Sequence, residues 1–167
     1  MAASLPVVAP SLEQDTRAFY EALSDLLRIY QFRDRDRICC HDISVTQCYA
    51  LEALVRRGPL GGNELAAELY LDKSTASRVV DALERKGYVV RERQPGDGRA
   101  VRLEITASGR ALHDRIVADI LAEEKSLLAD FDPEVRRALT ALLQRLARAA
   151  GSRVETGGGS CCRVPSA

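Results

Sequence analysis

The sequence has no net charge and no long apolar run, and each absence excludes a class of protein. Its 24 basic residues balance 24 acidic ones. Indiscriminate coating of nucleic acid is therefore not expected, and any nucleic-acid binding has to use a localised patch. No stretch of eighteen apolar residues is present, so we expect no membrane span. The apolar N-terminus lacks the basic flank of a signal peptide, and we expect a cytoplasmic protein.

Motifs for several kinds of chemistry are also missing. The five cysteines include no C-x-x-C pair of the kind found in zinc ribbons or thioredoxin-like sites. There is no H-E-x-x-H motif and no glycine-rich phosphate loop. An enzyme with a cysteine nucleophile and His41 as its base would also need an oxyanion site and a third group that orients the base, and the sequence indicates neither. We therefore predict that the protein is not an enzyme.

What is present is helical periodicity at both ends of the chain. The length of 167 residues suggests one domain with an adequate core. A long helix is predicted from Ser11, where Ser11 and Gln14 suit a capping box, and a second from Ser44, with Gln47 in the same relation. Two more helices are predicted at the other end, over about 107–129 and from Pro133 onward.

The middle of the chain predicts two short helices joined by a tight turn. The first covers residues 63–69, and the second opens at Asp72, whose carboxylate suits an N-cap, and ends at Gly87. The second helix has an apolar face and an outer face of short polar and basic side chains. This arrangement is a helix-turn-helix.

A basic β-hairpin follows directly, over residues 89–105 with turn residues at 94–99. Between Arg85 and Arg102 six basic residues stand against two acidic ones, a local excess of positive charge on a neutral chain. A groove-sized helix followed by a cationic wing suits duplex DNA, because the helix meets base edges while the cations meet the phosphates.

The run Asp97-Gly98-Arg99-Ala100-Val101-Arg102-Leu103-Glu104-Ile105-Thr106-Ala107-Ser108-Gly109 resembles the wing motif of the MarR family of transcriptional regulators, D-x-R-x-x-x-L-x-[LVI]-T-x-x-G. Residues 72–87 and 45–47 also resemble that family, and the likeness covers about residues 12–150. The resemblance implies a homodimer with one winged helix per subunit, a pseudopalindromic operator and control by an effector. It further implies that Arg99 enters the minor groove while Asp97 orients it.

The expected fold is mainly α with a small β-hairpin wing, and the end helices form a dimerisation region. We expect a flexible N-terminus over 1–10, a MarR-type domain over 11–150 and a flexible cysteine-containing tail over 151–167. Within the domain, 44–109 is the DNA-binding region, while 11–36 and 110–150 supply the dimerisation helices. The apolar stripes of those helices exceed what a compact DNA-reading region needs, and the alternative is a monomeric helical core.

The predicted DNA contacts lie on the recognition helix, 73–87, and on the wing, 89–105. Arg78 is expected to read a base, because arginine makes a bidentate pair with guanine. Phosphate contacts are expected from Lys73, Arg91 and Arg93, the alternative for each being a solvated charge. The predicted DNA-binding residues are Lys73, Ser74, Thr75, Ser77, Arg78, Arg91, Arg93, Asp97 and Arg99.

The cysteines predict an effector site. Cys39 and Cys40 are expected in the connection between the first two helices, and Cys161 and Cys162 in the tail. Two pairs of thiolates suit a soft metal or metalloid, with arsenite as the first candidate and an iron–sulfur cluster or zinc as the next. His41 is an optional further ligand. Cys48 is predicted to be a buried apolar residue.

These observations predict a homodimeric DNA-binding transcriptional regulator, expected to act as a repressor, with double-stranded operator DNA as its partner. Three alternatives stay open: a thiol redox-sensing regulator, an iron–sulfur or zinc regulator, and a non-regulatory metal-binding protein.

Overall fold

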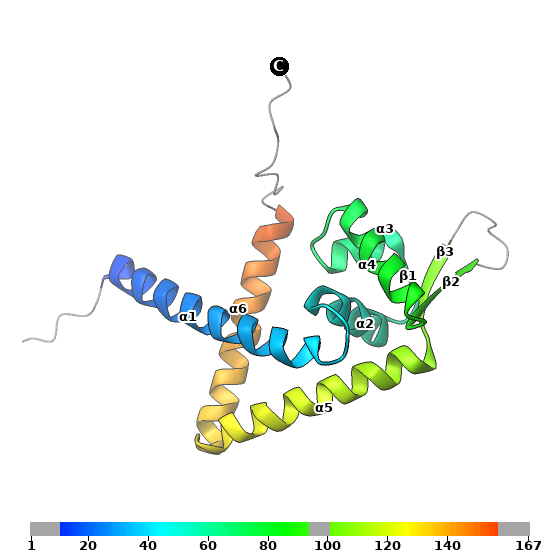
Figure 1. Cartoon of the computed structure of the whole chain (residues 1–167). Coiled ribbons are helices and arrows are strands. Elements are labelled where there is room, and N and C mark those ends of the chain that lie inside the picture. Colours follow the sequence, from blue (N-terminus) through cyan, green and yellow to red (C-terminus); the bar gives the residue numbers. More distant parts are fainter. Residues whose placement is uncertain (1–10, 94–100, 157–167) are drawn as a thin grey trace, which may run out of the picture. The chain divides into compact units, whose positions relative to one another are not determined.

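The computed structural model describes residues 11–93 and 101–156, with side chains placed except at 34, 36, 37, 39 and 154–156. It is mainly helical, with one small antiparallel sheet, which confirms the predicted fold class (Figure 1). The chain divides into two compact units, Met1–Asp119 and Ile120–Ala167. Within the described ranges, no helix combines the length and the apolar character that crossing a membrane requires.

Helix α1, Leu12–Cys39, begins where the sequence predicted but ends later. The Ser11 hydroxyl accepts from the Gln14 N–H, and the Gln14 side chain accepts from the Ser11 N–H, which together form the predicted capping box. The helix continues three residues past the predicted 11–36. The prediction that Cys39 lies in a connecting segment was therefore wrong, because Cys39 is the last helical residue and Cys40 is its C-cap.

Helix α2, Val45–Arg57, also begins at its predicted capping box, formed by Ser44 and Gln47. It ends at Gly58, whose φ of +77° lies in the region that favours glycine. Cys48 is buried, as predicted.

The helix-turn-helix is confirmed as α3, Gly62–Glu68, followed by α4, Lys73–Arg85. Asp72 caps α4, and Gly87, at φ +73°, follows its end. The helix-turn-helix packs on a buried apolar core. Its side chains come from α2, from the two helices themselves and from the sheet, and they include Leu51, Leu54, Leu65, Ala76, Val80, Leu83, Val89 and Leu103.

The predicted hairpin is present as β2, Val89–Arg93, and β3, Val101–Ile105, which pair antiparallel. A further strand, β1, Leu60–Gly61, pairs with the other edge of β3, so the strand order is β1-β3-β2. We did not predict β1, because two residues are too short to show an alternating pattern.

The last part of the wing motif joins the wing to the rest of the protein. The hydroxyls of Thr106 and Ser108 donate to the Gly87 carbonyl at 2.7 and 2.9 Å. The Thr106 N–H donates to the Tyr88 carbonyl at 3.0 Å. At Gly109 the backbones come so close that a Cβ would lie 2.2 Å from the Tyr88 oxygen. This part of the motif is therefore explained by backbone packing.

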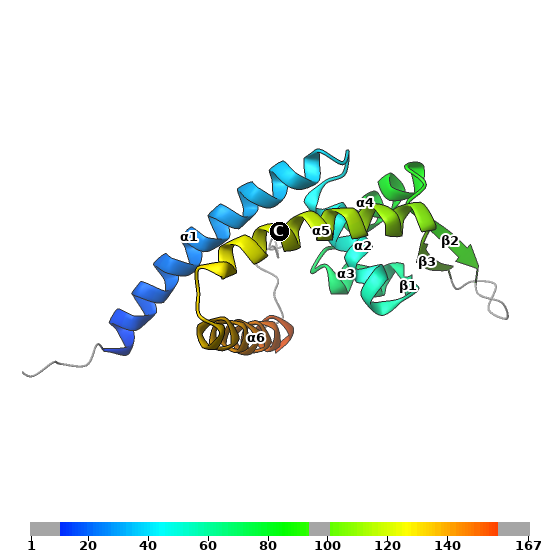
Figure 2. The same cartoon turned by 90° about the horizontal axis from the view of Figure 1, so that it is seen from below.

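Helices α5, Ala107–Ala129, and α6, Pro133–Thr156, begin at the predicted positions. Figure 2 shows α6 along its axis as one straight helix. It continues through Gly151 to Thr156, so residues 151–156 of the predicted tail are helical. A single glycine inside a helix costs only about 1 kcal/mol, and it did not end this helix.

The end helices α1 and α6 carry the predicted apolar side chains, and in the single chain these are exposed. On α6, Leu142 is 63% exposed. The other exposed apolar side chains of these two helices are Leu12, Phe19, Leu26, Leu27, Ile29, Phe32, Val135, Leu139, Leu143 and Leu146.

Candidate nucleic-acid interface

The first turn of α4 is ordered by the carboxylate of Asp72. Its Oδ1 accepts from the Ser74 hydroxyl at 2.6 Å and from the Thr75 N–H at 2.9 Å. Its Oδ2 accepts from the Thr75 hydroxyl at 2.7 Å. These hydrogen bonds, with those of the two hydroxyls as the largest cause, hold the pKa of Asp72 far below its ordinary value. Asp72 therefore stays ionised and fixes the rotamers of two predicted DNA-binding residues.

The sequence predicted that Asp72 caps the helix backbone. We did not predict that its carboxylate also accepts from the Ser74 and Thr75 hydroxyls. The signal for it was present, because hydroxyl residues at the second and third helical positions, Ser74 and Thr75, place three donors within reach of an N-cap aspartate. The hydroxyl of Thr75 is directed at Asp72, so it is less available to DNA than predicted.

Lys73, Ser77 and Arg78 are exposed on α4. The Arg78 guanidinium lies along the helix, with Nε donating to the Ser74 carbonyl at 3.3 Å and Nη2 to the Ser74 hydroxyl at 3.4 Å. Both contacts are long and use only part of its five N–H donors. The remaining donors are available for a base edge or a phosphate.

Arg91 makes ion pairs within the protein that we did not predict from the sequence. Its guanidinium forms ion pairs with Asp81 and Glu84, both on α4. The hydrogen bond with Asp81 is the largest cause that raises the pKa of Arg91 above its ordinary value. Two carboxylates offset its charge, so we propose that Arg91 holds β2 against the recognition helix instead of meeting a phosphate.

Two other cations of the basic stretch are also used within the protein. Lys86 pairs with Asp42, with 3.3 Å between Nζ and Oδ2. Arg102 donates to Glu64 Oε2 at 3.0 Å and to the Pro59 carbonyl at 3.2 Å, which ties β3 to the start of α3. The local charge excess read from the sequence therefore overstates the positive charge that faces solvent, because its carboxylate partners lie outside the stretch.

Arg93, the last residue of β2, is an exposed cation of the wing. Asp97 and Arg99, the two residues to which the family resemblance assigns the minor groove, lie outside the described residues. A hollow of about 320 Å³ is lined by residues of α3, α4 and the sheet, among them Lys73, Ser77 and Arg91.

The predicted thiolate site is only partly covered by the structure. Cys40 is exposed, whereas the side chain of Cys39 and all of Cys161 and Cys162 lie outside what is described. Nε2 of His41 lies 3.9 Å from Oδ2 of Asp119 on α5. Among the described side chains, no three His, Cys, Asp or Glu residues come together in a way that would hold a metal ion.

The comparisons with known proteins agree with this geometry. A family model described as the MarR family matches residues 41–100. The chain is 30% identical over 105 residues to the HTH-type transcriptional regulator YkoM of Bacillus subtilis, covering 63% of this chain and 68% of that protein. It is 30% identical over 109 residues to the HTH-type transcriptional regulator PecS of Dickeya dadantii, covering 64% of this chain and 66% of that protein. The matches thus span about two thirds of these relatives.

Solved structures show the same fold over most of the chain. A MarR family protein from Bacillus stearothermophilus aligns with a TM-score of 0.78 at 23% identity, over 85% of this chain and 99% of that one. A MarR transcriptional regulator from Methanosarcina mazei aligns with a TM-score of 0.71 at 26% identity, over 81% and 98%.

Proposed function

The chain belongs to the MarR family of winged helix-turn-helix transcriptional regulators, and from this premise we propose that it binds a pseudopalindromic duplex operator as a homodimer and represses transcription. The observation that carries the proposal is the outer face of α4. Lys73, Ser77 and Arg78 are exposed there, on a helix whose first turn is fixed by Asp72. A polar helix face whose first-turn rotamers are set in advance loses less entropy on binding.

The proposed contacts divide into two kinds. Arg78 reads a base from the major groove, and Ser74, Thr75 and Ser77 line the same turns of the helix. Lys73 and Arg93 meet phosphates, which position the protein without specifying sequence. From the family resemblance we further propose that Arg99 enters the minor groove and that Asp97 orients it.

Homodimerisation is supported by the exposed apolar side chains of α1 and α6. In the single chain, Phe19 on α1 is 48% exposed and Leu142 on α6 is 63% exposed. A twofold pair of chains would cover such side chains and would present two recognition helices to the two halves of an operator.

For the effector, we propose that Cys39 and Cys40, with Cys161 or Cys162, bind a thiophilic metal or metalloid such as arsenite. The exposure of Cys40 at the end of α1 supports this proposal. Because α6 ends at Thr156, four residues separate it from Cys161, and a chain of that length spans at most about 17 Å.

Operator binding is tested by gel shift with genomic fragments at several salt concentrations. Arg99→Ala should weaken binding and lower the salt slope by about one unit, as expected when one phosphate contact is lost. Arg137→Ala, at an exposed arginine of α6, is the matched control and should change neither. If Arg99→Ala leaves both affinity and slope unchanged, Arg99 is not in the interface.

The thiol proposal is tested separately by titrating arsenite, zinc and iron against operator binding. The double variant Cys161→Ser with Cys162→Ser should lose the response to the active ion. An equal response in the variant excludes the tail cysteines. A response to oxidant with none to the ions supports the redox alternative.

A further inference from the structure

Tyr70 has a backbone conformation that tyrosine rarely adopts. It lies in the turn between α3 and α4 with φ +53°, in the left-handed region where a Cβ is strained. Its N–H donates to the Ala67 carbonyl at 3.1 Å, and the Leu71 N–H donates to the Ala66 carbonyl at 2.9 Å. This pair of bonds is the Schellman motif, whose left-handed position is usually glycine.

The end of α4 shows what the same motif looks like with its usual residue. There Gly87 takes the left-handed position, at φ +73°, and its N–H donates to the Glu84 carbonyl at 2.9 Å. The Tyr88 N–H donates to the Leu83 carbonyl at 3.0 Å. The two helix ends are thus built alike, so helix termination alone does not explain a large aromatic at position 70. A strained residue at such a site points to a function.

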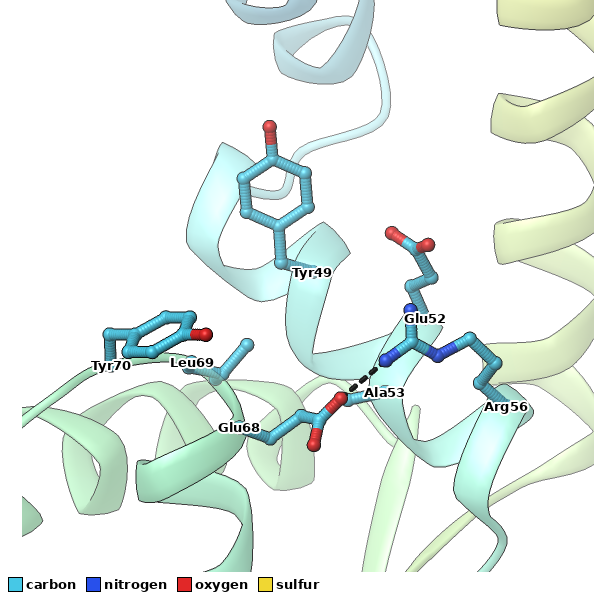
Figure 3. A pocket seen from close by; sticks show the side chains of 7 residues that line it. All are labelled: Tyr49, Glu52, Ala53, Arg56, Glu68, Leu69 and Tyr70. Atoms are coloured by element: carbon cyan, nitrogen blue, oxygen red, sulfur yellow. Dashed lines mark hydrogen bonds and ion pairs between the residues drawn. The ribbon is translucent and has the colours of Figure 1, made fainter. Parts of the chain in front are cut away.

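The side chain of Tyr70 is not used for packing, because 69% of it is exposed. It forms one wall of a cavity of about 320 Å³, between the turn and α2 (Figure 3). Tyr49, from α2, supplies a second aromatic wall and is 46% exposed. The chain therefore presents two tyrosine rings to one small cavity.

The charged groups of the cavity decide what kind of ligand it suits. Both oxygens of Glu68 are taken by arginines, Oε1 by Arg56 from the cavity wall and Oε2 by Arg57 at 2.8 Å. Glu52, also on the wall, carries a carboxylate for which the described part of the chain supplies no ion-pair or hydrogen-bond partner. The cavity lining itself thus carries two carboxylates, of Glu52 and Glu68, against one guanidinium, of Arg56, beside aromatic faces that attract cations.

We propose that this cavity binds a small organic cation, an aromatic amine or quaternary ammonium compound, between Tyr49 and Tyr70 with Glu52 as its counter-ion. Two residues after Tyr70, Asp72 begins the recognition helix. A bound cation therefore contacts both α2 and the turn that sets the position of α4. Any effect on operator binding rests on the proposed function, whereas binding of the cation does not.

Binding is measured on the full chain without DNA, by isothermal titration with benzyltrimethylammonium as the probe and benzoate as its anionic counterpart. The probe should bind saturably, and benzoate should not. Glu52→Gln should weaken the probe about fivefold, as expected for one partly exposed cation site. Tyr70→Phe should keep the affinity, because the ring is retained. No saturable binding, or equal binding of benzoate, overturns the proposal.

The variant Tyr70→Gly distinguishes a role of Tyr70 in ligand binding from a role in stabilising the turn. It should abolish probe binding and, by removing the strain, raise Tm by about 3 °C. Asp42→Gly, at the other left-handed non-glycine residue of the described chain, is the matched control and should leave binding unchanged. A lower Tm in Tyr70→Gly would show that Tyr70 stabilises the turn, and would overturn the claim that it is kept for a ligand.

Discussion

Leu51 on α2 and Leu142 on α6 are both leucines on amphipathic helices, yet the first is fully buried and the second is 63% exposed. The winged-helix region, residues 44–109, covers its own apolar side chains by packing α2, α3 and α4 with the sheet. The end helices α1 and α6 do not cover theirs. The DNA-reading region thus buries its own apolar side chains, while α1 and α6 each carry exposed ones, which we propose a second chain covers.

The largest expected effect comes from the buried side of the comparison. Leu51→Ala should lower the free energy of unfolding by about 3 kcal/mol, because it removes buried methyl groups and leaves a cavity. Leu142→Ala should cost far less at low protein concentration, where its side chain meets water. Urea denaturation followed by circular dichroism measures both. Equal losses in the two variants at low concentration would remove the distinction between the regions.

The oligomeric state at micromolar concentration tests the exposed side of the same comparison. Replacing Leu142 and Leu143 by glutamate should dissociate a dimer, because charges in an apolar interface are unfavourable. Sedimentation should then give the mass of one chain, 18.3 kDa, for the variant and twice that for the natural protein. A natural protein that sediments as a single chain at micromolar concentration contradicts the homodimer.

Gly109 tests how the wing is joined to α5. Gly109→Ala should destabilise the protein by about 2 kcal/mol, because the added Cβ would lie 2.2 Å from the Tyr88 oxygen and the backbones would have to separate. Gly62→Ala is the matched control, since a Cβ there meets nothing within 4 Å. A stability in Gly109→Ala that equals the control would mean that the close approach is not required.

Arg91 and Arg93 lie two residues apart on β2 and should behave differently. Arg93→Ala should lower the salt slope of operator binding by about one unit, as the loss of one phosphate contact does. Arg91→Ala should leave the slope unchanged and lower the free energy of unfolding by less than about 1 kcal/mol, as for a partly exposed ion pair. If Arg91→Ala reduces the slope as Arg93→Ala does, Arg91 meets phosphate after all.

The smallest effect is the pH dependence of the Asp72 cap. The pKa of Asp72 is lowered in the folded state, so its stabilising contribution is complete above about pH 4 and is lost as the pH falls below that value. Tm should therefore drop more steeply below pH 4 in the natural protein than in Asp72→Asn, which keeps an acceptor but does not titrate. Parallel Tm curves would contradict the assignment.

The helix starts were predictable because Ser11, Ser44, Asp72 and Pro133 act locally, through hydrogen bonds or backbone geometry within one turn. The ends of α1 and α6 were not, because no glycine or proline stops α1 near residue 36, and Gly151 alone did not end α6. The reassignment of Arg91 depended on Asp81 and Glu84, ten and seven residues away in sequence. Tertiary contacts of that kind cannot be read from local charge counts.

The most direct test is selection from a random duplex library by the purified protein, followed by hydroxyl-radical footprinting of the enriched sequence. The account predicts two inverted half-sites about 10 base pairs apart, both protected, because a twofold pair presents two recognition helices one helical turn apart. Enrichment of no sequence, or of a single half-site without an inverted repeat, would contradict it.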